Sequence, residues 1–285
     1  MDQHELTQLH DLSRSEALFA TLSNARFDFK PHLMVAAYVG SKAHNTYVPK
    51  DNPDSIDDID IMGIIIPPIE RVCGLSEWTH WTHSPTDDNE MDLCFYSVRK
   101  YVGLLLKSNP NVLGLLYMKP EMYLYRTDSF DYLLENRDIF ASQQAYNSFI
   151  GYAHGQLHKM ENQAYKGYMG QKRKELVDKF GYDCKNAAHA IRLLKMGNEF
   201  LETGGMNVWR THDANQIRDI KSGKWKLDEV KLYAKHLMEV ANKALATSPL
   251  PEHPEYKKAE EILVDLQRDE WNWTMLKRYS APSAW

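Results

Sequence analysis

Apolar residues recur at two different spacings along this chain, and the dominant spacing changes near residue 135. In the first part, the pattern predicts three strands, at 32–38, 56–66 and 90–97. It also predicts two helices, at 5–24 and 98–106. In the second part, helical spacing predicts helices near 141–164, 172–180, 183–203, 226–247 and 254–270. The pattern therefore predicts an α/β domain over residues 1–137, followed by a helical domain over residues 138–285.

The composition is that of an ordinary soluble protein. Of the 285 residues, 43% are hydrophobic and 26% are charged, and no apolar run approaches the roughly 20 residues that a membrane-spanning helix needs. The N-terminal residues show no secretory signal, and Cys73, Cys94 and Cys184 are too few and too widely spaced for a disulfide framework. We therefore expect a cytoplasmic protein with no membrane association and no disulfide-linked partner. The net charge of −5 argues against nonspecific coating of nucleic acid but leaves local contacts open.

One segment combines two features that suit phosphate chemistry. Gly40-Ser41 closes the first predicted strand, where glycine lets the backbone approach a phosphate, and the serine hydroxyl and nearby N–H groups can donate to it. Downstream, Asp58 and Asp60 lie two residues apart at the start of a strongly apolar strand. Because side chains alternate along a strand, both carboxylates share one face while the neighbouring isoleucines point into the core.

Two neighbouring carboxylates repel each other, and a divalent cation would relieve that repulsion. Magnesium favours carboxylate oxygens together with substrate phosphates, and two-metal sites stabilise the attacking and leaving oxygens of an in-line displacement. Such a site needs a third carboxylate from a neighbouring strand, for which Asp92 is the first candidate and Glu90, on the same face, is the alternative. Asp57 lies beside Asp58, so the register of the acidic pair is open, and alternation favours Asp58 with Asp60.

Each of these features has an ordinary explanation when it stands alone. A Gly-Ser pair is common, a DxD triplet more often forms a solvated turn or a helix cap, and an Asp-rich stretch could bind calcium. The glycine spacing and the terminal glutamate of an EF-hand are absent, however. The order of strand, Gly-Ser, loop, DxD strand and acidic strand is the feature that favours nucleotide chemistry.

These residues resemble the catalytic core of the DNA polymerase beta-like nucleotidyltransferase superfamily, whose signature is Gly-Ser, then DxD, then a third Asp. Within it, the chain is similar to the RNA-repair-associated nucleotidyltransferases of the RlaP family. The likeness extends through IIPPIERVCGLSEW, DLCFYSVRKYVGLLLKSNPNVLGLLY and YDCKNAAHAIRLLKMGNEFLETG, so that it covers most of residues 35–225. The loop between Ser41 and Asp58 is slightly longer than is usual in the family, with KDNP as the extra residues.

The resemblance implies a small mixed-sheet, palm-like domain followed by a helical domain that closes the active-site cleft. It implies a metal-dependent enzyme that moves a nucleoside monophosphate from an NTP such as ATP to a hydroxyl. Asp58 and Asp60 would hold two Mg²⁺ ions, or Mn²⁺, and Asp92 would hold the ion that activates the acceptor, an RNA end such as that of a tRNA in repair. Transfer to a protein or a small molecule is one alternative. A catalytically inactive binding protein is another, against which the intact Gly40, Ser41 and three aspartates argue.

Three basic side chains share one face of the predicted helix at 183–203. Lys185, His189 and Arg192 recur at positions i, i+4 and i+7, beside an apolar stripe. Such a face suits a triphosphate or a nucleic-acid backbone, although a solvated surface is the more frequent explanation for an isolated stretch. In the family that the chain resembles, the equivalent helix faces the active-site cleft. We therefore expect all three residues to bind nucleotide opposite Asp58 and Asp60.

Some histidine and asparagine residues are weaker candidates. The pairs His80 with His83 and His154 with His158 have spacings that zinc could use, but neither pair has a cysteine or an acidic partner beside it. The Asn-Pro-Asn run at 109–111 is expected to cap the following helix, with Asn111 as the capping residue.

Two basic clusters and two tyrosines could contact RNA. The basic clusters are Lys172, Arg173 and Lys174, and Lys221, Lys224 and Lys226. For these clusters, solvated helix ends are an equally good explanation. Tyr165 and Tyr168 could stack on bases, although core packing is the usual role of such residues.

Overall fold

The computed structural model describes residues 15–23, 27–49, 52, 55, 57–84, 91–161 and 171–280. Within these residues the strands are β1 (Leu33–Tyr38), β2 (Ile59–Ile65), β3 (His80–His83), β4 (Met91–Ser97) and β5 (Tyr123–Arg126). They form one sheet in the order β3-β4-β2-β1-β5. β2 and β4 run parallel and the other neighbours run antiparallel, so the sheet is mixed, as expected.

Residues 15–23 are helical, and longer helices dominate the rest of the chain. In chain order the helices after this segment are α2 (Gly40–Ala43), α3 (Ile69–Val72), α4 (Val98–Leu105), α5 (Pro110–Leu113), α6 (Asp128–Glu135), α7 (Gln144–Glu161), α8 (Gln171–Phe180), α9 (Cys184–Thr203), α10 (Ala214–Lys221), α11 (Leu227–Thr247) and α12 (Tyr256–Ser280). The fold is therefore α/β in its first part and helical in its second, which confirms the predicted class. Among the residues that the model describes, none of the helices is both long and apolar enough to cross a membrane.

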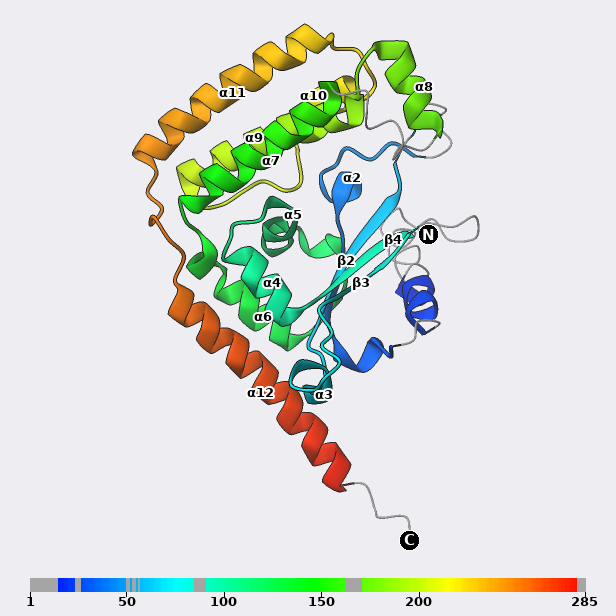
Figure 1. Ribbon diagram of the computed structural model, residues 1–285, viewed down its shortest axis with the longest axis vertical. Helices are drawn as coiled ribbons and strands as arrows, with labels where there is room; N and C mark the ends of the chain where they lie inside the picture. Colours follow the sequence, from blue (N-terminus) through cyan, green and yellow to red (C-terminus); the bar gives the residue numbers. More distant parts are fainter. Residues whose placement is uncertain are drawn as a thin grey trace, which may run out of the picture.

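The sheet has two faces, and each face has its own hydrophobic core. Helices α4, α5 and α6 lie on one face and the helical segment 15–23 lies on the other (Figure 1). Along β2, Met62 and Ile64 belong to the first core, whereas Ile59 and Ile61 belong to the second. Because Asp60 lies between Ile59 and Ile61, alternation puts its carboxylate on the face that the later helices cover.

The helices α7, α9, α10 and α11 lie together beyond one end of the sheet (Figure 1). Helix α9 contacts the other three, and Gly197 on α9 packs so closely on Phe149 of α7 that an added Cβ would lie 2.8 Å from the Phe149 Cβ. The Asp183 side chain caps the start of α9 by accepting from the N–H groups of Lys185 and Asn186. The helix ends at Gly204, whose φ of 75° is left-handed. These contacts hold α9 in one position relative to its neighbours.

The elements that the sequence did not predict are short. β3, β5, α6 and α10 have four to eight residues, and the sheet order puts β3 and β5 at its two edges. Such short segments show too few periods of either pattern to be recognised. The cluster of buried side chains that includes Met34 also includes Phe200 and Leu266, so packing is continuous across residue 137. The division into two domains at residues 137 and 138 stays a prediction.

Candidate nucleotide and metal site

A cavity of about 350 Å³ lies between the sheet and helix α9. Its floor comes from β2 and β4, one end comes from α2, and its opposite wall comes from α9. The predicted site residues that line it are Gly40, Ser41, Asp60, Asp92, Lys185, His189 and Arg192. Residues separated by up to about 150 positions in the chain are thus brought to one place, although their predicted roles stay predictions.

Two carboxylates face this cavity from adjacent parallel strands. Asp60 on β2 is paired in register with Asp92 on β4. Burial raises the pKa of Asp60 from 3.8 to about 6, Lys185 partly offsets this rise, and the charges of Asp92 and Asp58 add to it. Burial also raises the pKa of Asp92, and the charge of Asp58 adds to that rise. Burial is therefore the main reason that ionised carboxylates are disfavoured here, and the neighbouring carboxylates add to that effect.

Gly40 is required by the Asp60 carboxylate. Its φ of +61° is left-handed, and a Cβ at this position would lie 2.0 Å from Asp60 Oδ2. Any other residue would be strained in its backbone and would collide with the carboxylate. The sequence suggested that this glycine leaves room for a phosphate, and the structure adds that it leaves room for Asp60.

Asp58 lies just before β2, outside the lining of the cavity, although its charge raises the pKa of Asp60 and Asp92. Within the described residues, no three His, Cys, Asp or Glu side chains converge as they would around a metal ion. The chemistry of the site nevertheless fits a hard divalent cation, because the donors are carboxylate oxygens whose mutual repulsion is not neutralised.

Asp57 has a different environment from Asp60. Its carboxylate is buried and forms an ion pair with Lys221 of α10, and it also accepts a hydrogen bond from the Val48 N–H at 2.8 Å. Lys221 donates in addition to the Thr46 carbonyl at 3.3 Å. The Asp57 oxygens thus tie the loop before β2 to the helical part of the chain. Lys221, a candidate for RNA contact in the sequence, is only 7% exposed and lines the cavity in this ion pair.

The Arg192 guanidinium enters the cavity with neutral partners. Its Nη1 donates to His44 Nε2 at 2.5 Å and to Met196 Sδ at 3.4 Å. Burial lowers the pKa of Arg192 to about 9, with the charge of Arg210 adding to this effect and that of Asp60 opposing it. The guanidinium therefore lies near the carboxylates, but the hydrogen bonds of its Nη1 do not neutralise its charge.

Two further polar atoms in the cavity lining are buried without a hydrogen-bond partner in the described part of the chain. They are His189 Nε2 and Ser41 Oγ. Burial, followed by the charges of Arg192 and Lys185, lowers the pKa of His189 well below its usual value. Because buried polar groups are rarely left unpaired, both atoms are available to a ligand.

Several residues that line the cavity were missed or misread from the sequence. His44, Asp57 and Lys221 acquire their roles only through partners far along the chain, and no local pattern marks them. The helix cap was also wrong: Asn109 is the N-cap of α5 and accepts from the Asn111 N–H at 3.0 Å, because Pro110 suits the first helical position. Asn111 instead lines the cavity, and its Nδ2 donates to the Tyr152 hydroxyl at 2.7 Å.

The remaining candidates do not line this cavity, although the charge of His83 lowers the pKa of Asp92. His80 lies on β3 and bonds with Thr79, and its neighbour His83 stacks on Trp81. His154 and His158 are exposed on α7. Arg173 forms an ion pair with Asp183, and Lys224 forms one with Asp219. The structure does not describe Glu90, Tyr165, Tyr168 or the Lys172 side chain.

Comparisons with known proteins identify the family of the chain. The model of a family described as the RNA repair pathway DNA polymerase beta family, RlaP, matches residues 1–264. The structure of a nucleotidyltransferase-like protein from Exiguobacterium sibiricum 255-15 is similar, with 12% identity, coverage of 75% of this chain and 73% of that chain, and a TM-score of 0.29. No curated protein matches the chain.

Proposed function

Because the chain belongs to the RNA repair pathway DNA polymerase beta family, RlaP, we propose that it transfers a nucleoside monophosphate from an NTP to a hydroxyl acceptor. The observation that best supports this reaction is the in-register pair of Asp60 and Asp92, which faces the basic side of α9 across one cavity. A site with carboxylates on one wall and cations on the other suits a ligand that carries both metal ions and phosphates.

The nucleoside triphosphate would lie between Gly40-Ser41 and helix α9. Arg192 and Lys185 would offset the phosphate charge, and the buried Ser41 hydroxyl and His189 imidazole would donate or accept hydrogen bonds that they lack in the described chain. Arg192 should matter most among them, because its planar fork can donate to two phosphate oxygens at once.

Asp58, Asp60 and Asp92 would hold two Mg²⁺ ions, with Mn²⁺ as an alternative. When bound, such ions would neutralise phosphate charge and lower the pKa of the acceptor hydroxyl. The chain's own contribution is to present ionised carboxylates at a fixed separation, since β2 and β4 hold Asp60 and Asp92 in register. We assign Asp92 to the acceptor side and Asp58 with Asp60 to both ions. The bond from the α-phosphorus to the acceptor oxygen would form as pyrophosphate leaves.

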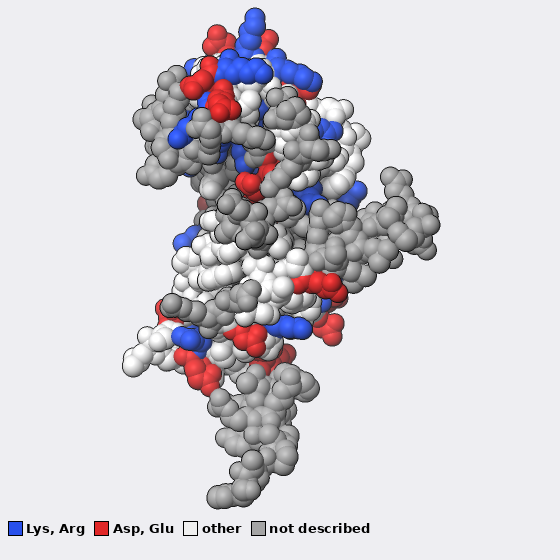
Figure 2. All heavy atoms as spheres, turned by 90° about the vertical axis from the view of Figure 1, so that its right-hand side faces the viewer, with Lys and Arg blue, Asp and Glu red and all other residues white. Residues whose placement is uncertain are grey.

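We propose an RNA end as the acceptor and ATP among the donors, in the cytoplasm. The family's description as part of an RNA repair pathway supports the choice of RNA. The surface gives a weaker indication, because Lys and Arg side chains gather with Asp and Glu at the helical end of the face in Figure 2. Such a mixed surface would also serve a protein or small-molecule acceptor, which remains the alternative.

The proposal can be tested by incubating the protein with each labelled NTP and Mg²⁺ together with total RNA or total protein. We expect label in the RNA fraction, and we expect none with Asp60→Asn. Label in the protein fraction would show that the acceptor is a protein and not RNA, and it would leave the proposed transfer reaction unchanged. Absence of label in every fraction, or equal labelling by wild type and Asp60→Asn, would overturn the proposed function.

A further inference from the structure

His44 lies in the turn after α2, where it connects two distant parts of the chain. The side chain is buried, with its Nδ1 at 2.9 Å from the Val208 carbonyl oxygen and its Nε2 at 2.5 Å from Arg192 Nη1. Val208 belongs to the loop between α9 and α10, which we call the 204–213 loop. The imidazole therefore links this loop to the guanidinium in the cavity.

The partners of His44 determine how its proton is placed. A guanidinium can only donate hydrogen bonds, so Nε2 must accept from Arg192. A carbonyl can only accept, so Nδ1 must carry the hydrogen that is donated to Val208. One neutral tautomer satisfies both partners, and a protonated ring would satisfy only one of them. Burial and the neighbouring charge of Arg192 agree with this state, since both lower the pKa of His44.

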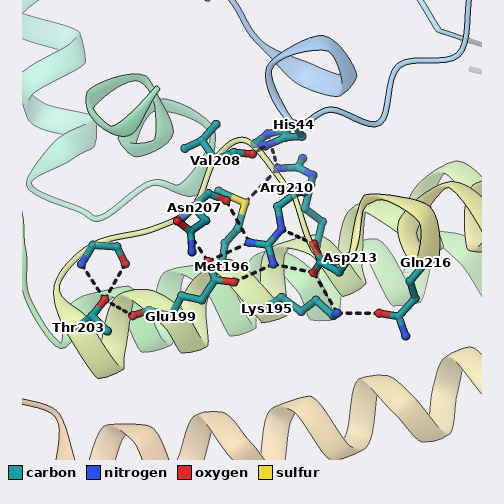
Figure 3. Close-up of polar contacts among 12 residues, drawn as sticks. His44, Lys195, Met196, Glu199, Thr203, Asn207, Val208, Arg210, Asp213 and Gln216 are labelled. Carbon is teal, nitrogen blue, oxygen red and sulfur yellow. Dashed lines mark hydrogen bonds and ion pairs between the residues drawn. The ribbon is translucent and has the colours of Figure 1, made fainter. Parts of the chain in front are cut away.

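The carbonyl that orients His44 is itself held in place by the 204–213 loop. The Arg210 side chain bonds Asp213 and Glu199, as Figure 3 shows, and so ties this loop to α9. The Arg210 carbonyl accepts from Asn45 Nδ2 at 3.0 Å, which ties the loop to the residue after His44. The His44 ring is consequently held between the Val208 carbonyl and Arg192, and it cannot turn away from Arg192 without losing a hydrogen bond.

We propose that His44 is a positioning residue that aims the Arg192 guanidinium at the nucleotide phosphates while leaving its positive charge intact. The proposal rests on the proposed function, because it assigns a phosphate ligand to Arg192. A carboxylate at position 44 would also orient the guanidinium, but it would neutralise the charge that the phosphates need. A neutral imidazole supplies the orientation alone. The contrast with Arg210, which is held by two carboxylates, shows that the fold uses both kinds of partner.

Three substitutions of His44 separate orientation from charge. His44→Gln keeps an acceptor for Arg192 and a donor for Val208, His44→Leu removes both, and His44→Asp keeps the acceptor but adds a negative charge. We would measure the dissociation constants of non-hydrolysable α,β-methylene analogues of the four NTPs and the KM and kcat of transfer. We expect His44→Leu and His44→Asp to weaken analogue binding by about ten-fold, the equivalent of about 1.4 kcal/mol, mainly through KM. His44→Gln should restore most of the affinity.

The outcomes can be told apart. Equal weakening by His44→Leu and His44→Gln, or normal binding by His44→Asp, would overturn the role of a neutral acceptor. A double-mutant cycle with Arg192→Met supplies the second test, because His44→Leu should add no further loss once Arg192 is gone. If Arg192→Met itself leaves analogue binding unchanged, the phosphate assignment of the proposed function fails. If Arg192→Met weakens binding but His44→Leu does not, only the role of His44 fails.

A measurement on the wild-type protein keeps the proposal testable if a variant does not fold. The ¹⁵N chemical shifts of the His44 ring report its tautomer and its charge directly. We expect a neutral ring with the proton on Nδ1 at neutral pH. A protonated ring, or a proton on Nε2, would overturn the proposal whatever the variants show.

Discussion

Arg210 and Arg192 both lie in the helical part of the chain, and they differ in their partners. Arg210 forms ion pairs with Glu199 at 2.7 Å and with Asp213 at 2.6 Å (Figure 3). Burial lowers the pKa of Arg210, but its hydrogen bonds to Asp213 and Glu199 hold that pKa above its usual value. Arg192 has His44 and Met196 instead, and burial lowers its pKa to about 9. The first arginine is satisfied by the fold, whereas the second retains charge for a ligand.

The same contrast separates two aspartates that are three residues apart. Asp57 is buried against Lys221 and accepts a backbone hydrogen bond, so its charge is compensated within the protein. Asp60 lines the same cavity as Asp57 but has no such ion pair in the described residues, and its pKa is raised mainly by burial, with the charges of Asp92, Asp58 and Asp57 adding to the rise. Two identical side chains therefore differ in how far their charge is compensated, because the tertiary structure places different partners beside them. Compensated groups should control stability and uncompensated groups should control the reaction.

The largest expected effect is a loss of nucleotide transfer when the carboxylate of Asp58 or Asp60 is removed. Asp60→Asn and Asp58→Ala should each lower the rate of nucleotide transfer by about 10³-fold or more, because metal stabilisation of the transition state is worth several kcal/mol. Single-turnover transfer of labelled NTP measures this rate, and circular dichroism checks the fold. Asp265→Asn, at an exposed residue paired with Arg268, is the matched control and should transfer normally. Near-normal turnover by either of these two variants would show that the substituted aspartate is not a metal ligand.

The compensated aspartate should instead affect folding. Asp57→Asn leaves the Lys221 ammonium buried without its counter-charge, which should lower the free energy of unfolding by about 3–5 kcal/mol. Urea unfolding measures the loss. Adding Lys221→Met should recover part of the stability, since the unpaired charge is then removed. A stable Asp57→Asn protein that has lost transfer would show that Asp57 acts in the reaction, and it would contradict the comparison.

Asp92 should act on the acceptor more than on the nucleotide. We expect Asp92→Asn to lower the transfer rate by about 10²-fold, the scale of losing one electrostatic stabiliser, with a much smaller change in NTP affinity. Rapid-quench rates and analogue titrations separate the two quantities. If Asp92→Asn is active and Glu90→Gln is not, the third carboxylate is Glu90.

The uncompensated charge of Asp60 should also appear in the pH dependence of stability without metal. Folding raises the pKa of Asp60 from 3.8 to about 6, so the ionised carboxylate destabilises the fold fully above about pH 6 and not at all below its unfolded pKa. In EDTA, Asp60→Asn should therefore be more stable than wild type by about 1–3 kcal/mol near neutral pH. The difference should vanish as the pH falls towards 4. Urea unfolding at a series of pH values measures this difference in stability. A difference that stayed constant with pH would contradict the raised pKa of Asp60.

The smallest effect should come from exchanging the two arginines for lysine. Arg192→Lys should weaken NTP binding by roughly five- to ten-fold and change stability little, because it loses the planar fork but keeps a cation. Arg210→Lys should lower the free energy of unfolding by about 1–2 kcal/mol, because its bidentate bonds to Asp213 are lost. Analogue titration and urea unfolding of both variants complete the test. A larger stability loss for Arg192→Lys than for Arg210→Lys would reverse the comparison.

Much of this architecture is predictable from local pattern. The predicted segments are occupied, with small shifts at their ends, by the strands β1, β2 and β4 and the helices α4, α7, α8, α9 and α11. The last helix, α12, was predicted near 254–270 and extends ten residues further, to Ser280. The alternation that pairs Asp58 with Asp60 also puts Ile59 and Ile61 in the core, where both are buried. The edge strands β3 and β5 and the short α10 were missed, because four to eight residues hold too few periods of a pattern.

The sequence by itself determined which segments form helices and strands, because that choice depends on neighbours a few residues away. It also supplied the candidate site residues, as Gly-Ser, DxD and a basic helix face. Only the tertiary structure decided which charges meet. Asp57 and Lys221 are 164 residues apart, and His44 and Arg192 are 148 apart, and no periodicity relates such pairs. Strand register and helix packing bring them together, and so decide which charged groups stabilise the fold and which remain for a ligand.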